Sequence, residues 1–176
     1  MAWYAVQARS NFEQLVANEL RAKGFEEYCP VFKEVHQWAD RKKVVELPVF
    51  PGYVFVRFAV SQAARLRILQ TYGVVQILGV NGIPEAIPET ELGPIRRMLD
   101  SDCAVGRHPF LQAGARVRVR RGALKDVEGV LVRVKNSARL VLSIAFLSQA
   151  VSTEVNIRDV EVLDKKRLRN NSTQAA

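Results

Sequence analysis

The chain has 176 residues, of which 48% are hydrophobic and 25% charged, a composition typical of a globular protein with one domain or two small ones. No apolar run approaches the roughly 18 residues that a membrane span needs, and a strand pattern begins at Trp3, so we expect a cytoplasmic protein without membrane span or signal peptide. Cys29 and Cys103 lie far apart without a partner spacing, and we expect both to be reduced thiols.

The net charge of +8 is unevenly distributed along the chain. Residues 1–105 hold 12 basic and 12 acidic side chains, whereas residues 106–176 hold 14 basic and 6 acidic ones. Such a division indicates two domains with different electrostatic tasks. We expect an amino-terminal domain over 1–100, a linker over 101–112, a carboxy-terminal domain over 113–164 and a disordered basic tail over 165–176.

The first elements are a strand from Trp3 to Ala8 and a helix. Ser10 and Glu13 have the spacing of a capping box, in which the serine accepts from the N3 amide and the glutamate reaches back. Phe12, Leu15, Val16 and Leu20 follow at helical spacing, and Gly24 ends the helix.

Residues 26–35 are expected to form a second strand, interrupted by Pro30. Residues 36–46 carry Trp38 and the basic run Arg41-Lys42-Lys43 before apolar residues resume, which predicts a protruding hairpin with a basic tip. A plain solvated turn would explain the charges equally well. The tryptophan beside three cations favours contact with nucleic acid, where stacking and phosphate binding use that combination.

The stretch 47–58 combines a stiff turn, Pro48 to Gly52, with a strand. Under the period of two, Val54, Val56 and Phe58 point to one side and Tyr53, Phe55 and Arg57 to the other. The first set is expected in the core, and the second on a face that meets a partner. The alternative is a strand buried on both faces.

A capped helix is expected over 62–71, with Leu66 and Leu69 inward and Arg65 and Arg67 outward. A strand over 74–78, a tight turn at Asn81-Gly82 and a helix from Glu89 that starts late or kinks at Pro94 complete this half. The order predicts an α+β domain with a four-stranded, mostly antiparallel sheet and three helices on one face, similar to ribonucleoprotein (RNP) domains.

Beyond the linker, apolar residues alternate with period two from Val117 to Ile157. Five short strands within about 50 residues predict a small closed all-β barrel.

The residues offer no catalytic constellation. His36 and His108 are isolated and lack triad or metal-ligand spacing, and no glycine-rich phosphate loop occurs. We therefore expect a binding protein without enzymatic activity, cofactor or metal. Residues 51–58 nearly match the first RNP motif, except that Pro51 replaces the leading cation and Val54 occupies the small position. An RNA-binding protein that stacks bases on Tyr53 and Phe55 and also uses the basic carboxy-terminal barrel is one alternative.

Both halves resemble the bacterial NusG family of transcription elongation and antitermination factors. In the amino half, the resemblance rests on Trp3-Tyr4 with Gln7-Ala8, on Phe50-Pro51-Gly52-Tyr53-Val54-Phe55-Val56, on Gly73-Val74-Val75 and on Ala86-Ile87-Pro88. In the carboxy half, residues 113–122 and 127–130 are similar to a KOW motif, and Gly122 and Gly129 fall where such a barrel needs positive φ or close backbone approach.

The resemblance implies that the amino domain docks on the clamp helices of the RNA polymerase large subunit and that the protein is a monomer. It also implies a contact with upstream or non-template DNA. The residues implied in the polymerase pocket are Phe50, Pro51, Tyr53, Phe55, Trp3 and Tyr4. Those implied near DNA are Trp38, Arg41, Lys42, Lys43, Arg65, Arg67, Thr71 and Tyr72.

In this family the KOW domain recruits Rho or a ribosomal small-subunit protein, and the matching partner-binding residues here are Leu124, Val127, Phe146 and Leu147. The first loop has Leu124 and Val127 where housekeeping members have phenylalanines, which argues against Rho. In this respect the chain looks like the specialised antiterminators exemplified by RfaH. A ribosome-associated KOW protein is the second alternative.

Overall fold

The computed structural model of the chain describes residues 1–37, 42–101, 103, 105–108, 114–134, 137–144 and 147–163. The chain divides into two compact units, Met1–Leu92 and Gly93–Ala176. Its described residues form three α-helices and several antiparallel sheets, so the fold is α+β. None of these helices is both long enough and apolar enough to cross a lipid bilayer.

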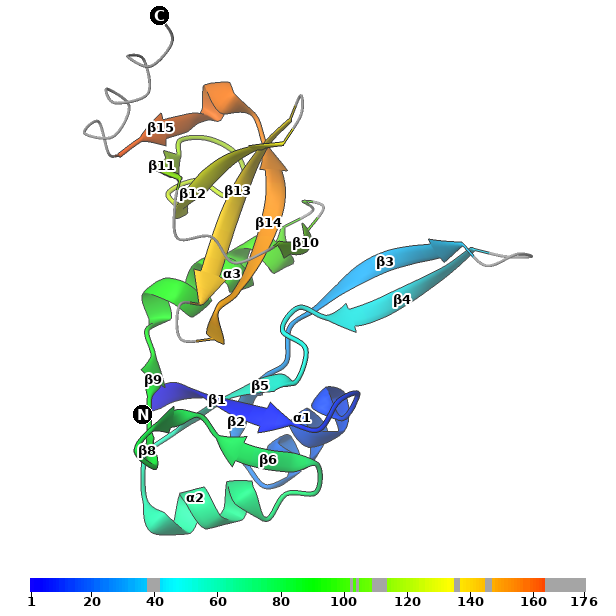
Figure 1. Ribbon diagram of the computed structural model, residues 1–176, viewed down its shortest axis with the longest axis vertical. Coiled ribbons are helices and arrows are strands. Elements are labelled where there is room, and N and C mark those ends of the chain that lie inside the picture. Colours follow the sequence, from blue (N-terminus) through cyan, green and yellow to red (C-terminus); the bar gives the residue numbers. More distant parts are fainter. Residues whose placement is uncertain are drawn as a thin grey trace, which may run out of the picture. The chain divides into compact units, whose positions relative to one another are not determined.

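The amino-terminal unit is built on an antiparallel sheet in the order β2-β5-β1-β6 (Figure 1). The four strands are β1 (Ala2–Ala8), β2 (Glu26–Tyr28), β5 (Tyr53–Phe58) and β6 (Val74–Ile77). This is the expected four-stranded arrangement, to which β9 (Ala86–Ile87) adds a fifth strand by pairing with β1.

Helices α1 (Glu13–Ala22) and α2 (Gln62–Leu69) pack on one face of this sheet. Val16 and Leu20 of α1 and Ile68 of α2 share a core cluster with Tyr4, Val6, Val54, Val56 and Phe58. Helix α3 (Glu89–Asp100) contains Pro94 in its interior and contributes no described residue to this cluster. Two of the three expected helices therefore form the helical layer over the sheet.

The amino end of α1 differs from its expected form. Ser61 caps α2 as expected, because its Oγ accepts from the Ala64 amide at 3.1 Å. Ser10 does not cap α1, which begins at Glu13 with Phe12 in the cap position and no side-chain cap. The chain turns first, with Asn11 at a φ of 64° and the Phe12 amide donating to the Arg9 carbonyl. Glu13 is consequently the first helical residue and not the third, so the capping-box interpretation is wrong.

The inward side of α2 also differs from the prediction. Leu66 and Leu69 are 49% and 40% exposed, whereas Ile68 is completely buried. Ala64 and Ile68, four residues apart, face the sheet. Because Leu66 lies two positions from both, it points to the opposite side of the helix.

Two hairpins extend the amino-terminal unit. Strands β3 (Val31–Gln37) and β4 (Lys42–Pro48) pair along their whole length, from Val31 with Pro48 to Gln37 with Lys42. They form the expected hairpin, which projects from the sheet of its unit (Figure 1). The second hairpin joins β7 (Gly79–Val80) to β8 (Ile83–Pro84) through the expected Asn81-Gly82 turn.

The carboxy-terminal unit contains a six-stranded antiparallel sheet in the order β10-β14-β13-β12-β11-β15. Strand β10 (Val105–His108) pairs with β14, so part of the expected linker belongs to this sheet. Residues 140–142 and 150–153 are buried consecutively, which means that β13 and β14 are covered on both faces there. Ile157, expected inside, is exposed because it lies in the short 3-10 turn η2 (Ile157–Asp159). The other strands are β11 (Ala115–Val119), β12 (Glu128–Val134), β13 (Ser137–Ile144), β14 (Gln149–Val155) and β15 (Val160–Val162).

Candidate partner-binding face

The strand register assigns the aromatic residues of the amino-terminal sheet to two faces. Ala5 pairs with Phe55 and Trp3 with Arg57, so these residues share the face opposite to α1 and α2. Tyr28 of β2 lies beside Phe55 and adds a further ring to this face. Tyr4 belongs to the helical side, where its ring lies 4.7 Å from that of Phe58. The structure therefore brings Trp3 together with Phe55 and separates Tyr4 from them, which corrects the expected position of Tyr4.

Residues Phe50 to Tyr53 form a tight turn before β5. The Tyr53 amide donates to the Phe50 carbonyl at 3.1 Å, and Gly52 has a φ of 80°. Proline at the second position and glycine at the third are the residues that a type II turn requires. We call residues 50–53 the FPGY turn.

Three further hydrogen bonds fix the FPGY turn and the residue before it against the rest of the unit. The Val49 amide donates to the Pro30 carbonyl at 2.8 Å, and the Ala8 amide donates to the Gly52 carbonyl at 2.8 Å. The Gly52 amide donates to Glu13 Oε1 at 2.7 Å. Glu13 is a buried side chain, so its carboxylate fixes the turn from the first residue of α1. The sequence shows Glu13 near a helix start but gives no signal of this long-range bond.

The predicted open aromatic face is largely closed. Phe50 and Phe55 are 1% and 0% exposed, and their rings meet edge to face at 5.4 Å. The Tyr28 ring also lies close to Phe55, with ring centroids 6.3 Å apart. The expectation that Phe55 projects outward is thus wrong, because the FPGY turn folds Phe50 against it.

The accessible part of this surface is smaller than expected. Pro51 is exposed and Tyr53 is half-buried, so these two residues are presented above the buried Phe50–Phe55 pair. Arg57, at the end of β5, is exposed and forms an ion pair with Glu26 of β2 at 3.2 Å. Trp3, by contrast, is buried.

A second group of expected site residues lies at the carboxy end of α2. Arg67 donates to the Lys23 carbonyl, and its guanidinium lies 4.9 Å from the centre of the Phe25 ring. Lys23 Nζ donates to Thr71 Oγ1 at 2.7 Å and to the Arg67 carbonyl at 3.1 Å. The Lys23 ammonium group thus lies at the carboxy end of α2, which is the negative end of the helix dipole. Thr71 is buried and its hydroxyl is used inside the unit, which corrects its expected place on the surface.

Tyr72 is the most accessible aromatic side chain of this group, with 65% of its surface exposed. Its ring contacts Phe12 edge to face at 5.7 Å, and the Arg9 guanidinium lies 5.9 Å from its centre. Arg65 donates to the Gly82 carbonyl at 2.8 Å. The structure therefore adds Arg9 and Lys23 to the expected basic residues at this end. No sequence pattern pointed to either residue.

The remaining expected residues lie partly outside the described chain. Trp38 and Arg41 at the hairpin tip are not among the described residues, and Lys42 and Lys43 are described only as backbone of β4. In the carboxy-terminal unit, Phe146 and the tail 165–176 lie outside the description. Leu124, Val127 and Leu147 are buried, so they are core residues and not the surface contacts that the resemblance implied.

Two observations bear on the reactive chemistry of the described residues. Burial raises the pKa of the Cys29 thiol from 9.0 to about 12, with further contributions from the carboxylates of Glu27 and Glu13. Cys29 therefore stays protonated at neutral pH and is a poor nucleophile. Among the residues that the structure describes, no cluster of His, Cys, Asp and Glu could hold a metal ion.

Comparison with known proteins gives consistent matches. A family model described as "Transcription termination factor nusG" matches residues 1–96, more than half of the chain. The transcription termination/antitermination protein NusG of Vibrio vulnificus is 29% identical over 174 residues, which cover 92% of this chain and 96% of that protein. The protein of the same name from Escherichia coli K12 is 28% identical, with coverages of 90% and 94%. A solved structure of Thermotoga maritima NusG has a TM-score of 0.55 at 19% identity and covers 93% of this chain and 97% of that one, which indicates a shared fold.

Proposed function

This chain belongs to the NusG family of transcription termination and antitermination factors, and from that membership we propose that it regulates elongation by binding RNA polymerase. The amino-terminal unit is the polymerase-binding module, and its contact is the clamp of the large subunit. The hairpin β3–β4 and the end of α2 contact upstream or non-template DNA. The carboxy-terminal unit, as a KOW domain, recruits a second factor.

The observation that carries this proposal is the construction of the FPGY turn. Two hydrogen bonds from β1 and α1 hold the turn, and a third holds Val49 directly before it. The ring of Phe50 also packs edge to face against that of Phe55. The turn presents Pro51 and Tyr53, a rigid and largely apolar pair. Rigid aromatic anchors of this kind dominate protein–protein interfaces, because they lose little side-chain entropy on binding.

The DNA contact is proposed for a different side of the same unit. Tyr72 is exposed next to Arg9, and Arg65 and Arg67 lie on the neighbouring helix. An exposed ring with a guanidinium group beside it suits the stacking of an unpaired base with neutralisation of its phosphate. The basic run 41–43 at the hairpin contributes further positive charge.

The second factor is a ribosomal small-subunit protein in preference to Rho. Leu124 and Val127 stand where the housekeeping pattern has phenylalanines, and both are buried. A loop without exposed aromatic anchors offers less to a partner that depends on them. This supports a specialised antiterminator of the RfaH type over a housekeeping factor.

The polymerase contact is tested by comparing two tyrosine substitutions. Tyr53→Ala is expected to weaken binding of the full chain to purified, DNA-free core polymerase by about 30-fold, the loss typical of an interface hot spot. Tyr53 is half-buried and Phe50 completely buried, so substitution at Tyr53 disturbs the fold less than substitution at Phe50 would. Binding is measured by biolayer interferometry.

Tyr72→Ala is the matched control, because it removes the same ring from the surface assigned to DNA. Its affinity for DNA-free polymerase should be unchanged, while its crosslinking to non-template DNA in an elongation complex should fall. If Tyr53→Ala binds polymerase as well as the unaltered chain does, the proposed contact is wrong.

The structure disfavours the RNA-binding alternative. A stacking platform needs accessible ring faces, whereas Phe55 is completely buried and has the rings of Phe50 and Tyr28 close to it. Titration with single-stranded RNA in the absence of polymerase checks this alternative. Binding that depends on both Tyr53 and Phe55 would restore it.

A further inference from the structure

Glu13 lies at the junction between α1 and the FPGY turn. Gln7 near the end of β1 pairs with Tyr53 at the start of β5, so the segment that leads into α1 runs beside the turn. The Glu13 carboxylate accepts from the Gly52 amide at 2.7 Å. Glu13 is 5% exposed, and it is the only acidic or basic residue that is buried in the part of the chain for which burial is described. A residue so deeply buried influences a docked protein only through the groups that it holds.

The Gly52 amide is the main-chain donor that the turn itself leaves unused. The Tyr53 amide closes the turn by donating to the Phe50 carbonyl at 3.1 Å, and Pro51 has no N–H group. Of residues 51–53, only Gly52 therefore has an amide that needs an acceptor outside the turn. Glu13 supplies that acceptor, and a carboxylate is the strongest acceptor among the side chains.

The same hydrogen bond selects the form of the turn. Turns of types I and II share the closing hydrogen bond and differ by a flip of the central peptide, here the one between Pro51 and Gly52. The third residue of the turn has a φ of about −90° in type I and about +80° in type II, and Gly52 has a φ of 80°. By holding the Gly52 N–H group, Glu13 holds the type II form. Because this peptide is trans, the Pro51 carbonyl points away from Glu13.

The central peptide lies between the two residues of the proposed polymerase contact. Pro51 on one side is exposed, and Tyr53 on the other is half-buried. A flip of the peptide would exchange the positions of the Pro51 carbonyl and the Gly52 amide, so an acceptor would be replaced by a donor. A partner that fits one form does not fit the other, and the population of the fitting form then sets the apparent affinity.

We propose that Glu13 is a positioning residue for polymerase binding, which keeps the FPGY turn in the form that the polymerase recognises. This role rests on the polymerase contact proposed above, for which Tyr53→Ala is the test. It assigns part of the affinity to a side chain that does not touch the polymerase.

Three substitutions at Glu13 separate the hydrogen bond from the charge. Glu13→Ala removes the acceptor and is expected to weaken binding of the full chain to DNA-free core polymerase about fivefold or more, mainly through slower association, because fewer molecules hold the type II turn in advance. Glu13→Gln keeps an acceptor oxygen at the same reach and should bind within about twofold of the unaltered chain. Glu13→Asp keeps the charge but is one methylene group shorter, so binding should weaken about threefold or more. Biolayer interferometry measures all three. Normal binding of Glu13→Asp together with weak binding of Glu13→Gln would show that the charge matters and would contradict the proposal.

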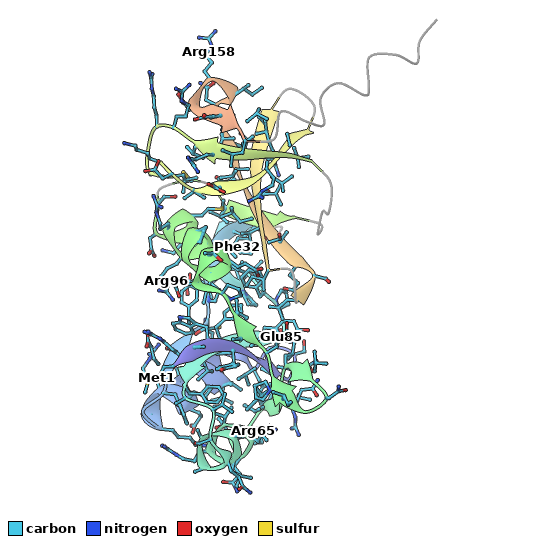
Figure 2. All side chains as sticks on the ribbon, turned by 90° about the vertical axis from the view of Figure 1, so that its left-hand side faces the viewer. Met1, Phe32, Arg65, Glu85, Arg96 and Arg158 are labelled. Carbon is cyan, nitrogen blue, oxygen red and sulfur yellow. The ribbon has the colours of Figure 1, made fainter. Side chains whose placement is uncertain are left out.

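The matched control is Thr71→Val, which removes another buried and hydrogen-bonded side chain from the same unit. Thr71 follows α2, the helix that carries Arg65 in Figure 2, and its hydroxyl accepts from Lys23 Nζ at 2.7 Å. Urea unfolding should show a loss of stability in both Thr71→Val and Glu13→Ala, whereas polymerase affinity should fall only in Glu13→Ala. An equal loss of affinity in the two variants would identify general destabilisation as the cause and overturn the proposal.

A double-mutant cycle shows whether Glu13 acts through the turn. In the Tyr53→Ala background, Glu13→Ala should weaken binding less than about twofold further, because the main anchor of the turn is already absent. A full additional loss would place the effect of Glu13 elsewhere, against the proposal. Proton NMR gives an independent readout: the resonance of the Gly52 amide proton should move upfield in Glu13→Ala and stay at low field in Glu13→Gln. A Gly52 resonance that does not move in Glu13→Ala would also contradict the positioning role.

The positioning role and the polymerase contact fail in different ways. If Tyr53→Ala weakens polymerase binding and Glu13→Ala does not, only the positioning role is wrong. If neither substitution weakens binding, the polymerase contact itself is wrong, and the positioning role is wrong with it.

Discussion

At the scale of single residues, Glu13 links the first helix to the FPGY turn. Its carboxylate accepts from the Gly52 amide at 2.7 Å in a partly buried setting. Glu13→Ala leaves that amide without its acceptor, which costs about 1–3 kcal/mol of unfolding free energy. Glu13→Gln keeps an acceptor oxygen but loses the charge, so its cost should be about half as large. Urea unfolding followed by circular dichroism measures both.

The control for Glu13 is Glu19→Ala on the same helix, because Glu19 is exposed. Its effect should stay within about 0.5 kcal/mol, as for most surface substitutions. A more specific readout is hydrogen exchange at the Gly52 amide, which should accelerate in Glu13→Ala and remain slow in Glu13→Gln. Unchanged exchange in Glu13→Ala would show that the carboxylate does not hold the turn.

Residue directions were only partly predictable from the sequence. The period of two correctly separated Val54, Val56 and Phe58 from Tyr53, Phe55 and Arg57. It could not show that Phe55 is buried, because burial depends on Phe50, which the FPGY turn brings back over the sheet. Hydrogen bonds between residues distant in sequence, such as Glu13 with Gly52 or Lys23 with Thr71, have no local signature.

At the scale of elements, Gly129 illustrates a position where backbone approach decides the residue. A Cβ at Gly129 would lie 2.7 Å from the Val141 carbonyl oxygen of the neighbouring strand, too close for van der Waals contact. Gly129→Ala is therefore expected to destabilise the β12–β13 pair by about 1–3 kcal/mol, the usual cost of overpacking. Hydrogen exchange of the amides in the two strands measures the loss.

Gly106→Ala in β10 is the matched control, because a Cβ there would meet nothing within 4 Å. It should leave the protection of β12 and β13 unchanged. If the amides of β12 and β13 exchange as slowly in Gly129→Ala as in Gly106→Ala, the two strands can move apart enough to accept the added Cβ. The steric argument would then be wrong.

Strands and helices with a strong local signal were the predictable elements. Ser61 at the start of α2, Asn81-Gly82 in the second hairpin and the pairing of β3 with β4 were all confirmed. Strand β10 was missed because Val105–His108 is short and has no apolar alternation of its own. It is a strand because β14 supplies its hydrogen-bonding partner.

At the scale of the whole molecule, family membership was accessible from the sequence because it rests on motifs spread over both halves. A motif match needs only residue identities, whereas the hydrogen bond from the Arg120 amide to the Asp159 carbonyl joins residues 39 positions apart and depends on the fold. The uneven distribution of charge can be counted from the sequence, but the sequence does not show which arginines form ion pairs with carboxylates. Those pairs depend on the strand register, which places Glu128 beside Arg118.

The charge distribution predicts different salt dependences for the two proposed binding activities. Residues 1–105 are neutral, and the whole net charge of +8 lies in residues 106–176. Polymerase binding through the apolar Pro51–Tyr53 surface should weaken less than threefold between 50 and 200 mM salt, because few counterions are released. Binding of single-stranded DNA through three arginines, Arg9, Arg65 and Arg67, should weaken about tenfold or more over the same range, because a slope of about 0.7 per phosphate applies to each contact. Both are measured on the unaltered full chain, one by biolayer interferometry and one by anisotropy. If the two affinities fell in parallel, the polymerase contact would be electrostatic and the assignment of apolar docking to the amino-terminal unit would be wrong.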